Sequence, residues 1–236
     1  MKTKITLILL AHNEEKTILK DIKNINKNIL KKIKSTEFII RHDGSSDKTH
    51  EIISSVKKKY KIKYIYSTYR LGVHKALYLS LKKAKGKFIF FADSGNKFNY
   101  KEFWKLYKYR KKFGIVSGHR INRKDQNYRI LLTSFFNIFL RLFTISKFKD
   151  IDSGFKIFNK SAVKKALSLK KYNSHFYMSE ICLKIIYMGY NFKEVKVNYY
   201  QRPSKSRATS LVKIPVMIFS FLFNFIKLKN QLNNIK

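Results

Sequence analysis

The sequence predicts an α/β fold in which a mostly parallel sheet is flanked by helices. Over the first 120 residues, short apolar runs alternate with longer amphipathic stretches, as strands and helices do when they follow one another. Hydrophobic residues make up 44% of the 236 residues, which is too apolar for a disordered basic chain. A chain of this length buries about two-thirds or more of its unfolded surface, so we expect one large domain with a real core.

Five apolar runs have the length of strands: 5–10, 37–41, 64–66, 88–91 and 115–117. Four amphipathic stretches have helical periodicity: 14–30, 47–59, 73–83 and 100–112. The first run follows Lys2 and Lys4 like the start of a signal peptide, but it ends in acidic residues without a cleavage site. We interpret it as the first strand. In such a sheet the ligand crevice lies beyond the carboxyl ends of the strands, which directs attention to 11–15, 42–47 and 68–75.

Two long apolar runs follow residue 120, at 130–145 and 214–226. Thirteen helical residues reach about 20 Å, well short of the roughly 30 Å hydrocarbon core, so neither run is expected to span a membrane. Two alternatives stay open: a helix packed on the protein's own core, or an interfacial helix whose basic flanks meet anionic lipid. We favour membrane association in the plane of the surface.

The chain carries 52 Lys and Arg against 14 Asp and Glu, a formal charge of +38. Codon bias in an AT-rich genome explains Lys in place of Arg, but it does not explain so few acids. A strong positive potential favours anionic partners, namely nucleic acid, acidic lipid headgroups or phosphorylated substrates. The only cysteine, Cys182, cannot form an internal disulfide, so nothing points to an oxidising compartment and we expect a buried thiol.

Four motifs stand in order in the first half. Residues 42–49 read HDGSSDKT after an apolar strand, a pattern that a tight turn with a helix cap would explain by itself. The others are 10–15 (LAHNEE), 70–76 (RLGVHKA) and 88–93 (FIFFAD). Together they resemble the N-terminal half of a family 2 glycosyltransferase of the GT-A fold, whose motifs usually read like PAYNEE, DDGSxDxT, GxxxA and DxD.

The resemblance continues downstream, from about residue 5 to 210. Residues 118–120 (GHR) are similar to the family's GSR, 150–156 (DIDSGFK) to DxTSGFR, and Glu180 with 194–197 (EVKV) to its E…EVPV segment. The branch that is closest by size resembles the polyprenyl-phosphate, or dolichol-phosphate mannose synthase-like, enzymes. The resemblance implies a Rossmann-like GT-A domain over 1–210, followed by a C-terminal amphipathic helix and basic tail over 211–236.

The family's donor site, carried over by motif, implies a set of nucleotide-sugar-binding residues here: Ala11, His12, Glu14, Asp43, Gly72, Lys75 and Asp93. Asp93 is the implied ligand of Mg²⁺ or Mn²⁺, since hard cations take oxygen ligands that can include the diphosphate. The DxD motif has become Asp93-Ser94-Gly95, which leaves one carboxylate. His42 replaces the first Asp of DDGS, so the resemblance does not name UDP or GDP.

The acceptor decides whether a general base is needed, because a hydroxyl must lose a proton whereas a lipid phosphate is already an anion. Asp93 is the first predicted catalytic residue, and Glu180 and Asp150 are the carboxylates available as bases. Glu180 lies in an expected helix at 177–182, and the alternative for it is to tether Arg or Lys side chains. A phosphate acceptor would need cations, and the predicted ones are five basic residues: Arg120, Arg129, Arg202, Lys205 and Arg207.

These features predict an inverting glycosyltransferase that moves a sugar from a nucleotide-diphosphate donor to a polyprenyl phosphate or another membrane-associated glycan acceptor. It would work in cell-envelope glycan biosynthesis, in the cytoplasm at the inner face of an anionic membrane. The altered DxD leaves a sugar-nucleotide binder without turnover as one alternative. A nucleic-acid-binding protein is a weaker one, because acids cluster at strand ends and no RNP-like, helix-turn-helix or zinc pattern is present.

Overall fold

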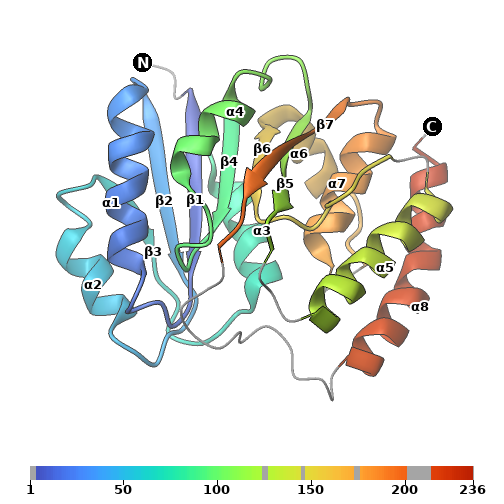
Figure 1. The fold of residues 1–236 in the computed structure, drawn as a ribbon, viewed down its shortest axis with the longest axis horizontal. Coiled ribbons are helices and arrows are strands. Elements are labelled where there is room, and N and C mark those ends of the chain that lie inside the picture. Colours follow the sequence, from blue (N-terminus) through green and yellow to red (C-terminus); the bar gives the residue numbers. More distant parts are fainter. Residues whose placement is uncertain (1–3, 124–126, 145–146, 173–175, 201–213, 236) are drawn as a thin grey trace.

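The structure is a computed structural model that describes residues 4–123, 127–144, 147–172, 176–200 and 214–235. Its centre is a seven-stranded sheet in the order β3-β2-β1-β4-β6-β5-β7 (Figure 1). The strands are β1 (Ile5–Ala11), β2 (Thr36–His42), β3 (Ile62–Ile65), β4 (Phe88–Asp93), β5 (Ile115–Ile121), β6 (Phe155–Asn159) and β7 (Phe192–Asn198). Only β6 runs antiparallel to its neighbours, so the mostly parallel sheet is confirmed.

The sheet is covered on both faces because its central strands are apolar on both sides. All seven residues of β1 are buried. Leu7 and Leu9 point into one core, and Ile8 and Leu10 into the other, as the alternation of a strand requires. Continuous apolar strands of this kind are typical of sheets that lie between two layers of helices.

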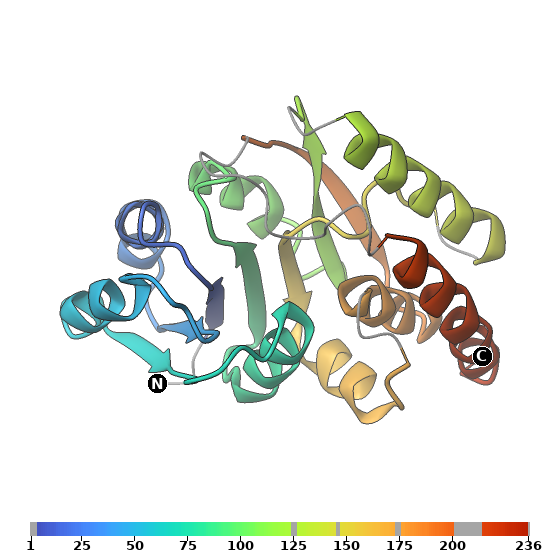
Figure 2. The same ribbon diagram turned by 90° about the horizontal axis from the view of Figure 1, so that it is seen from below.

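The helices are α1 (Ile18–Asn28), η1 (Leu30–Lys32), α2 (Thr49–Val56), α3 (Val73–Lys83), η2 (Tyr100–Glu102), α4 (Phe103–Tyr107), α5 (Asn127–Phe143), α6 (Lys160–Ser168), α7 (Tyr177–Tyr187) and α8 (Ile214–Asn233). Seen along the strands, α1 and α4 lie on one face of the sheet, and α3, α6 and α7 on the other (Figure 2). The thiol of Cys182 is buried among the second group, as predicted, and burial raises its pKa to about 12.

Most predicted elements of the first half are present, with shifted ends. The helix expected from residue 14 begins at Ile18, because 14–17 form a turn in which the Glu14 carbonyl accepts from the Thr17 and Ile18 amides. The third strand lies at 62–65 and not at 64–66. Three elements, β6, β7 and α6, have no counterpart among the expected ones, whereas the helix expected at 177–182 is present as part of α7.

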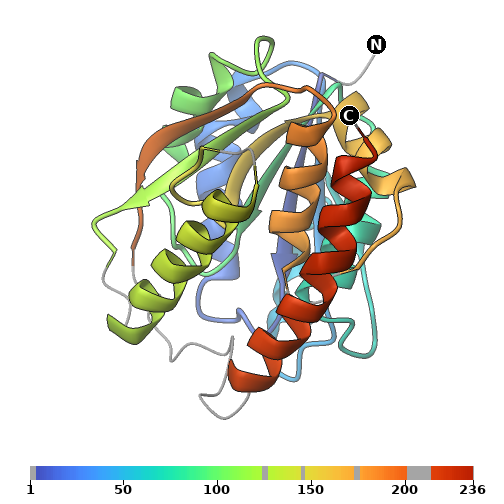
Figure 3. The same cartoon turned by 90° about the vertical axis from the view of Figure 1, so that its right-hand side faces the viewer.

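Helices α5 and α8 lie side by side at one end of the molecule (Figure 3). Phenylalanines join them, with ring centroids 5.0 Å apart for Phe136–Phe221 and 5.1 Å for Phe139–Phe225. The inner face of α8 is buried in the core, while its outer face and that of α5 stay exposed. We call these exposed side chains the α5–α8 face: Leu131, Phe135, Ile138, Leu142, Phe143, Val216, Ile218, Phe219, Leu222, Phe223 and Ile226. Within the described ranges, no helix combines the length and the hydrophobicity needed to cross a bilayer.

Candidate active site

Several of the predicted site residues meet at one edge of the sheet, at the carboxyl ends of its parallel strands. In the register of the sheet, Ala11 lies opposite His42 and Leu10 opposite Asp93. The antiparallel strand β6 starts at this edge, and Arg120 lies there as the second-last residue of β5. The edge therefore brings together segments that are far apart in the chain, from Ala11 to Phe155, as an open α/β sheet does at its ligand crevice.

Asp43 holds the turn that precedes α3. Its carboxylate accepts hydrogen bonds from the Leu71 amide at 2.6 Å and the Gly72 amide at 3.1 Å, and its carbonyl lies 2.8 Å from His12 Nδ1. Gly72 has a φ of 82°, a backbone conformation that favours glycine. Asp43 thus fixes the shape of this turn, at whose end Lys75 is exposed on α3.

Two residues of the predicted donor set are turned into the protein. Ala11 is fully buried, and its carbonyl accepts from the Asp43 amide at 2.9 Å. The buried Glu14 carboxylate accepts from Ser94 Oγ at 3.0 Å and from Thr17 Oγ1 at 2.8 Å. This geometry makes both residues supports of the site, because Glu14 positions the residue that follows Asp93.

Asp93 ends β4 with a carboxylate that is 32% exposed, so it is open to a ligand. Lys97 Nζ lies 3.4 Å from Asp93 Oδ2. The Asp93 amide donates to the Gly154 carbonyl at 2.8 Å, and a Cβ atom at position 154 would overlap the Asp93 carboxyl group. Glycine at 154 is therefore the residue that leaves room for this carboxylate.

The loop after Asp93 is tied to α1 by Asp21, which the sequence analysis did not single out. The Asp21 carboxylate accepts from the Gly95 amide at 2.9 Å, the Asn96 amide at 3.2 Å and Tyr100 Oη at 3.0 Å. Burial raises the pKa of Asp21 to about 6, although these hydrogen bonds oppose the shift. The tether sets the direction in which the chain leaves Asp93.

Arg120 and Asp150 form a two-pronged ion pair. Arg120 Nε and Nη2 each lie 2.7 Å from an Asp150 oxygen, and the Arg120 guanidinium sits 5.5 Å from the Tyr199 ring. Burial would raise the pKa of Asp150, but the Arg120 charge outweighs it and lowers that pKa. A carboxylate that is buried, paired and held ionised is a weak proton acceptor, so this geometry does not favour the base role predicted for Asp150.

Glu180 is also enclosed. It forms an ion pair with Lys184 at 2.6 Å, one turn along α7, and both side chains are almost fully buried. The carboxylate accepts from the Tyr172 amide, and Lys184 donates to the Lys170 carbonyl at 2.7 Å. The pair thereby anchors residues 170–172. The predicted general-base role of Glu180 is not favoured, because substrate cannot reach a carboxylate in this position.

The Glycosyl transferase family 2 model matches residues 6–168, more than half of the chain. The chain belongs to this family. A dolichyl-phosphate beta-glucosyltransferase from Dictyostelium discoideum is 27% identical over 181 residues, covering 68% of this chain and 55% of that protein. An uncharacterised glycosyltransferase from Rickettsia conorii is 30% identical over 128 residues, 52% of this chain and 20% of the relative. The chain thus spans at most about half the length of these two relatives.

Solved structures share the fold at low identity. Glucosyl-3-phosphoglycerate synthase from Mycobacterium tuberculosis, in complex with Mn²⁺, UDP and phosphoglyceric acid, superposes with a TM-score of 0.72 and 16% identity, covering 96% of this chain and 78% of that one. A mannosyltransferase from Pyrobaculum calidifontis in complex with GDP-Man and Mn²⁺ gives 0.65 and 17%, covering 88% and 59%. The α/β fold of this family 2 chain is therefore GT-A-like.

The family's divalent cation can be tested against the donor groups present. Asp93 offers one accessible carboxylate at the sheet edge, while Ser94 Oγ is occupied by Glu14. Among the described residues, no group of three His, Cys, Asp or Glu side chains could hold a metal by itself. The site fits a cation that shares its oxygen ligands between Asp93, water and a diphosphate, as Mg²⁺ often does.

Asp152 is the acid that the sequence analysis missed, two residues from the Asp150 it selected. Solvent reaches the Asp152 side chain, and Ser179 Oγ donates to it at 3.2 Å. Surrounding protein still penalises its charged form and raises its pKa to about 6, against the opposing charges of Arg120 and Lys156. The sequence shows that Asp152 belongs to the DIDSGFK motif. It does not show whether Asp150 or Asp152 pairs with Arg120.

His42, where the family pattern has an acid, belongs to a cluster of rings with Tyr66 and His50. The His42 and Tyr66 rings stack at 5.1 Å, and Tyr66 is 49% exposed. Burial lowers the pKa of His42, which keeps the ring neutral at pH 7. The side chain of Arg129 and the predicted Arg202, Lys205 and Arg207 lie outside the described residues.

Proposed function

We propose that this family 2 chain transfers a sugar, with inversion, from a nucleoside diphosphate donor to a membrane-associated acceptor. The observation that carries the proposal is the sheet edge, where the turn held by Asp43, the accessible Asp93 carboxylate and the Arg120 side chain come together. The Dictyostelium relative, by name a dolichyl-phosphate glucosyltransferase, supports a lipid phosphate as acceptor. An acid-poor chain of charge +38 suits anionic substrates and an anionic membrane.

In this mechanism the residues at the edge hold the donor and balance its charge. The 68–75 turn and the exposed Tyr66 ring take the nucleoside, which also fits the predicted role of His12 beside Asp43. Asp93 is the protein ligand of Mg²⁺ or Mn²⁺, which when bound would neutralise the departing diphosphate. Lys97 adds a positive charge 3.4 Å from Asp93, where the DxD motif has lost its second acid.

Asp152 is the group at this edge that can take a proton. It is open to solvent, faces Arg120, Lys156 and Asp150, and has a pKa of about 6, so it is mostly deprotonated at pH 7. A hydroxyl acceptor would need this base, whereas a lipid phosphate would attack without it. In place of Asp150 and Glu180, we therefore assign the base role to Asp152 for a hydroxyl acceptor.

The function is tested with purified protein, a panel of UDP- and GDP-sugars, and Mg²⁺ or Mn²⁺. Thermal shift identifies the donor, because ligand binding to the folded state raises its stability by mass action. Release of nucleoside diphosphate is then measured with polyprenyl phosphate in vesicles. If a donor binds but no acceptor leads to release of nucleoside diphosphate, the protein would instead be a sugar-nucleotide binder without turnover. This alternative stands because Asp93-Ser94-Gly95 has one acid where the DxD motif has two. No binding of any donor would refute both.

Replacing Asp152 with asparagine is expected to slow transfer to a hydroxyl acceptor by about 10²- to 10⁴-fold and to leave transfer to a phosphate acceptor nearly unchanged. In the native protein the hydroxyl reaction should fall as pH drops below about 6, because protonated Asp152 cannot accept a proton. The measurement is kcat against pH for both proteins. An acid limb near pH 6 that persists in the variant would remove Asp152 from the base role.

The α5–α8 face supports docking on a membrane. Phe219 is 76% exposed and Leu142 is 75% exposed, unusual values for large apolar side chains in a soluble fold. Lys227 lies 4.3 Å from the Phe223 ring and Lys229 5.5 Å from the Phe143 ring, so ammonium groups flank the apolar surface. An apolar face with basic flanks is what an interfacial helix uses on anionic lipid.

Changing Phe219, Leu222 and Phe223 together to serine should remove the salt-resistant part of binding to vesicles made of equal parts of phosphatidylcholine and phosphatidylglycerol. Salt weakens only the electrostatic part, since the Debye length falls from about 10 Å at 0.1 M to about 3 Å at 1 M. The measurement is vesicle co-sedimentation at both salt concentrations. All three side chains are exposed, so the variant should melt like the native protein.

The control variant replaces Tyr69 and Val73 with serine, because both side chains are exposed but lie outside the α5–α8 face. It should bind vesicles like the native protein. Native protein that stays in the supernatant at low salt would show that the α5–α8 face does not dock on lipid.

A further inference from the structure

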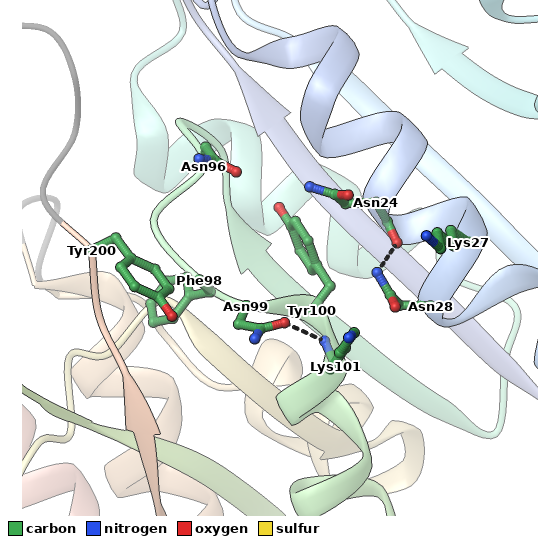
Figure 4. A pocket seen from close by; sticks show the side chains of 9 residues that line it. All are labelled: Asn24, Lys27, Asn28, Asn96, Phe98, Asn99, Tyr100, Lys101 and Tyr200. Atoms are coloured by element: carbon green, nitrogen blue, oxygen red, sulfur yellow. Dashed lines mark hydrogen bonds between the residues drawn. The ribbon is translucent and has the colours of Figure 1, made fainter.

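A polar cleft of about 310 Å³ lies between α1 and the segment that follows β4. Its walls come from three parts of the chain: Asn24, Lys27 and Asn28 on α1, Asn96 and Lys101 around η2, and Tyr200 after β7 (Figure 4). Figure 4 shows Tyr200 at the opposite end of the cleft from the α1 side chains. No motif of the sequence points to this cleft, and none of the predicted donor-site residues lines it.

Several polar groups in the cleft are available for a ligand. The side chains of Asn24 and Asn96 make no hydrogen bond within the described part of the chain, and the amine groups of Lys27 and Lys101 form no ion pair there. By contrast, Asn28 donates to the Asn24 carbonyl at 2.9 Å and serves the helix. The free amides offer both donors and acceptors, which suits a ligand with several hydroxyl groups.

The cleft also has an aromatic wall. Tyr200 is 48% exposed, and its ring offers an apolar surface to the carbon-bound hydrogens of a sugar ring. Its position is fixed by the backbone, because the Tyr200 amide donates to the Lys97 carbonyl at 2.8 Å. A few convergent polar groups beside an aromatic ring are the usual content of a small-molecule site.

The cleft adjoins the catalytic edge. Asn96 is three residues from Asp93, which limits the separation of their Cα atoms to about 11 Å. The neighbour of Tyr200 in the chain, Tyr199, packs under the Arg120 guanidinium. One lining residue of the cleft, Asn96, therefore lies on the loop that leaves Asp93.

We propose that this cleft binds a sugar ring of the acceptor that carries a carboxylate or phosphate group. Asn24 and Asn96 would bond its hydroxyls, Tyr200 would cover one face of the ring, and Lys27 and Lys101 would meet the anionic group. The inference rests on the proposed transferase function and deepens it, because it assigns a glycan-bearing acceptor in preference to a bare polyprenyl phosphate.

The test is an NMR titration of the full chain with three probes: methyl β-glucuronide, glucose 6-phosphate and methyl β-glucoside. It is run with the donor nucleotide and Mg²⁺ at saturation, so that the probes cannot enter the donor site. The two anionic probes should bind about tenfold more tightly than the glucoside, and their ratio shows whether carboxylate or phosphate is preferred. Asn24→Ala and Tyr200→Ala should each weaken all three by about fivefold, the loss of one neutral contact.

The double variant Lys27→Gln, Lys101→Gln should bind the anionic probes no better than the glucoside. Lys23→Gln is the matched control, since Lys23 is exposed on the same helix but outside the cleft, and it should change nothing. Failure of every probe to bind, or binding that Asn24→Ala and Tyr200→Ala leave unchanged, would overturn the proposal. Failure of the transferase function is a separate result, because it appears as absent nucleotide binding or as absent release of nucleoside diphosphate, and neither is read out by the probes.

Discussion

Replacing Asp93 with alanine is expected to lower turnover by about 100-fold or more while leaving the fold intact. Asp93 is the only carboxylate left from the DxD pattern, and it is accessible at the end of β4. Without it, charge on the departing diphosphate is under-neutralised. The measurement is kcat for nucleoside diphosphate release across a range of Mn²⁺ concentrations, together with thermal melting to show that the variant is folded.

A second variant disturbs the Asp93 carboxylate through Gly154, which lies against it. Gly154→Ala places a methyl group where the Asp93 carboxyl lies, so it should reproduce the loss although every acid remains in the chain. Ser55→Ala, a change on the exposed surface of α2, is the matched control and should keep the native rate. Metal-dependent turnover near the native rate in Asp93→Ala would remove this residue from the site.

Replacing Lys184 with methionine is expected to lower the free energy of unfolding by about 3–5 kcal/mol, because it leaves the Glu180 carboxylate buried without its cation. The measurement is urea unfolding at pH 7. The double variant Glu180→Gln, Lys184→Met should recover most of the loss, since a neutral pair can replace a buried ion pair at little cost.

Lys63→Met provides the control, because its ion pair with Glu37 is more exposed and should be worth about 1 kcal/mol or less. The double variant also decides the role of Glu180. Its turnover per folded molecule should stay near native if the pair is structural. Stable double-variant protein that has lost turnover would return Glu180 to catalysis.

The first half of the fold was predictable because its signals are local. Each of β1, β2 and β4 is an apolar run followed by a helix, so periodicity alone identifies them. β7 is different: its sequence, FKEVKVN, alternates charged and apolar residues at the edge of the sheet, so it lacks an apolar run. β6 is five residues long and is defined by its pairing with β4 and β5, which is not a property of its own sequence.

For the site too, features that follow from local sequence were predictable, whereas contacts between distant residues were not. The order of the motifs was enough to place Asp43, Asp93 and Arg120 at the same edge, since the positions of strand ends follow from the order of the elements. The choice between Asp150 and Asp152 depended on which carboxylate meets Arg120, a contact across 30 residues. For Glu180 a signal was present, because Lys184 lies four residues on in a helix that is otherwise apolar on nearly all sides.

Helix α8 serves both the proposed membrane docking and the folded core. Its inner side chains Phe221, Phe225, Leu228 and Leu232 belong to the same core as Ile8 at the centre of the sheet. The helix that we propose to rest on lipid is therefore no detachable tail. Removing residues 214–236 would expose the apolar side chains of α7 and of the core that α8 covers. A shortened enzyme made to avoid detergents or vesicles would therefore lose one exposed apolar surface and gain another. Solubility is better sought by changing the outer face of α8 than by cutting it away.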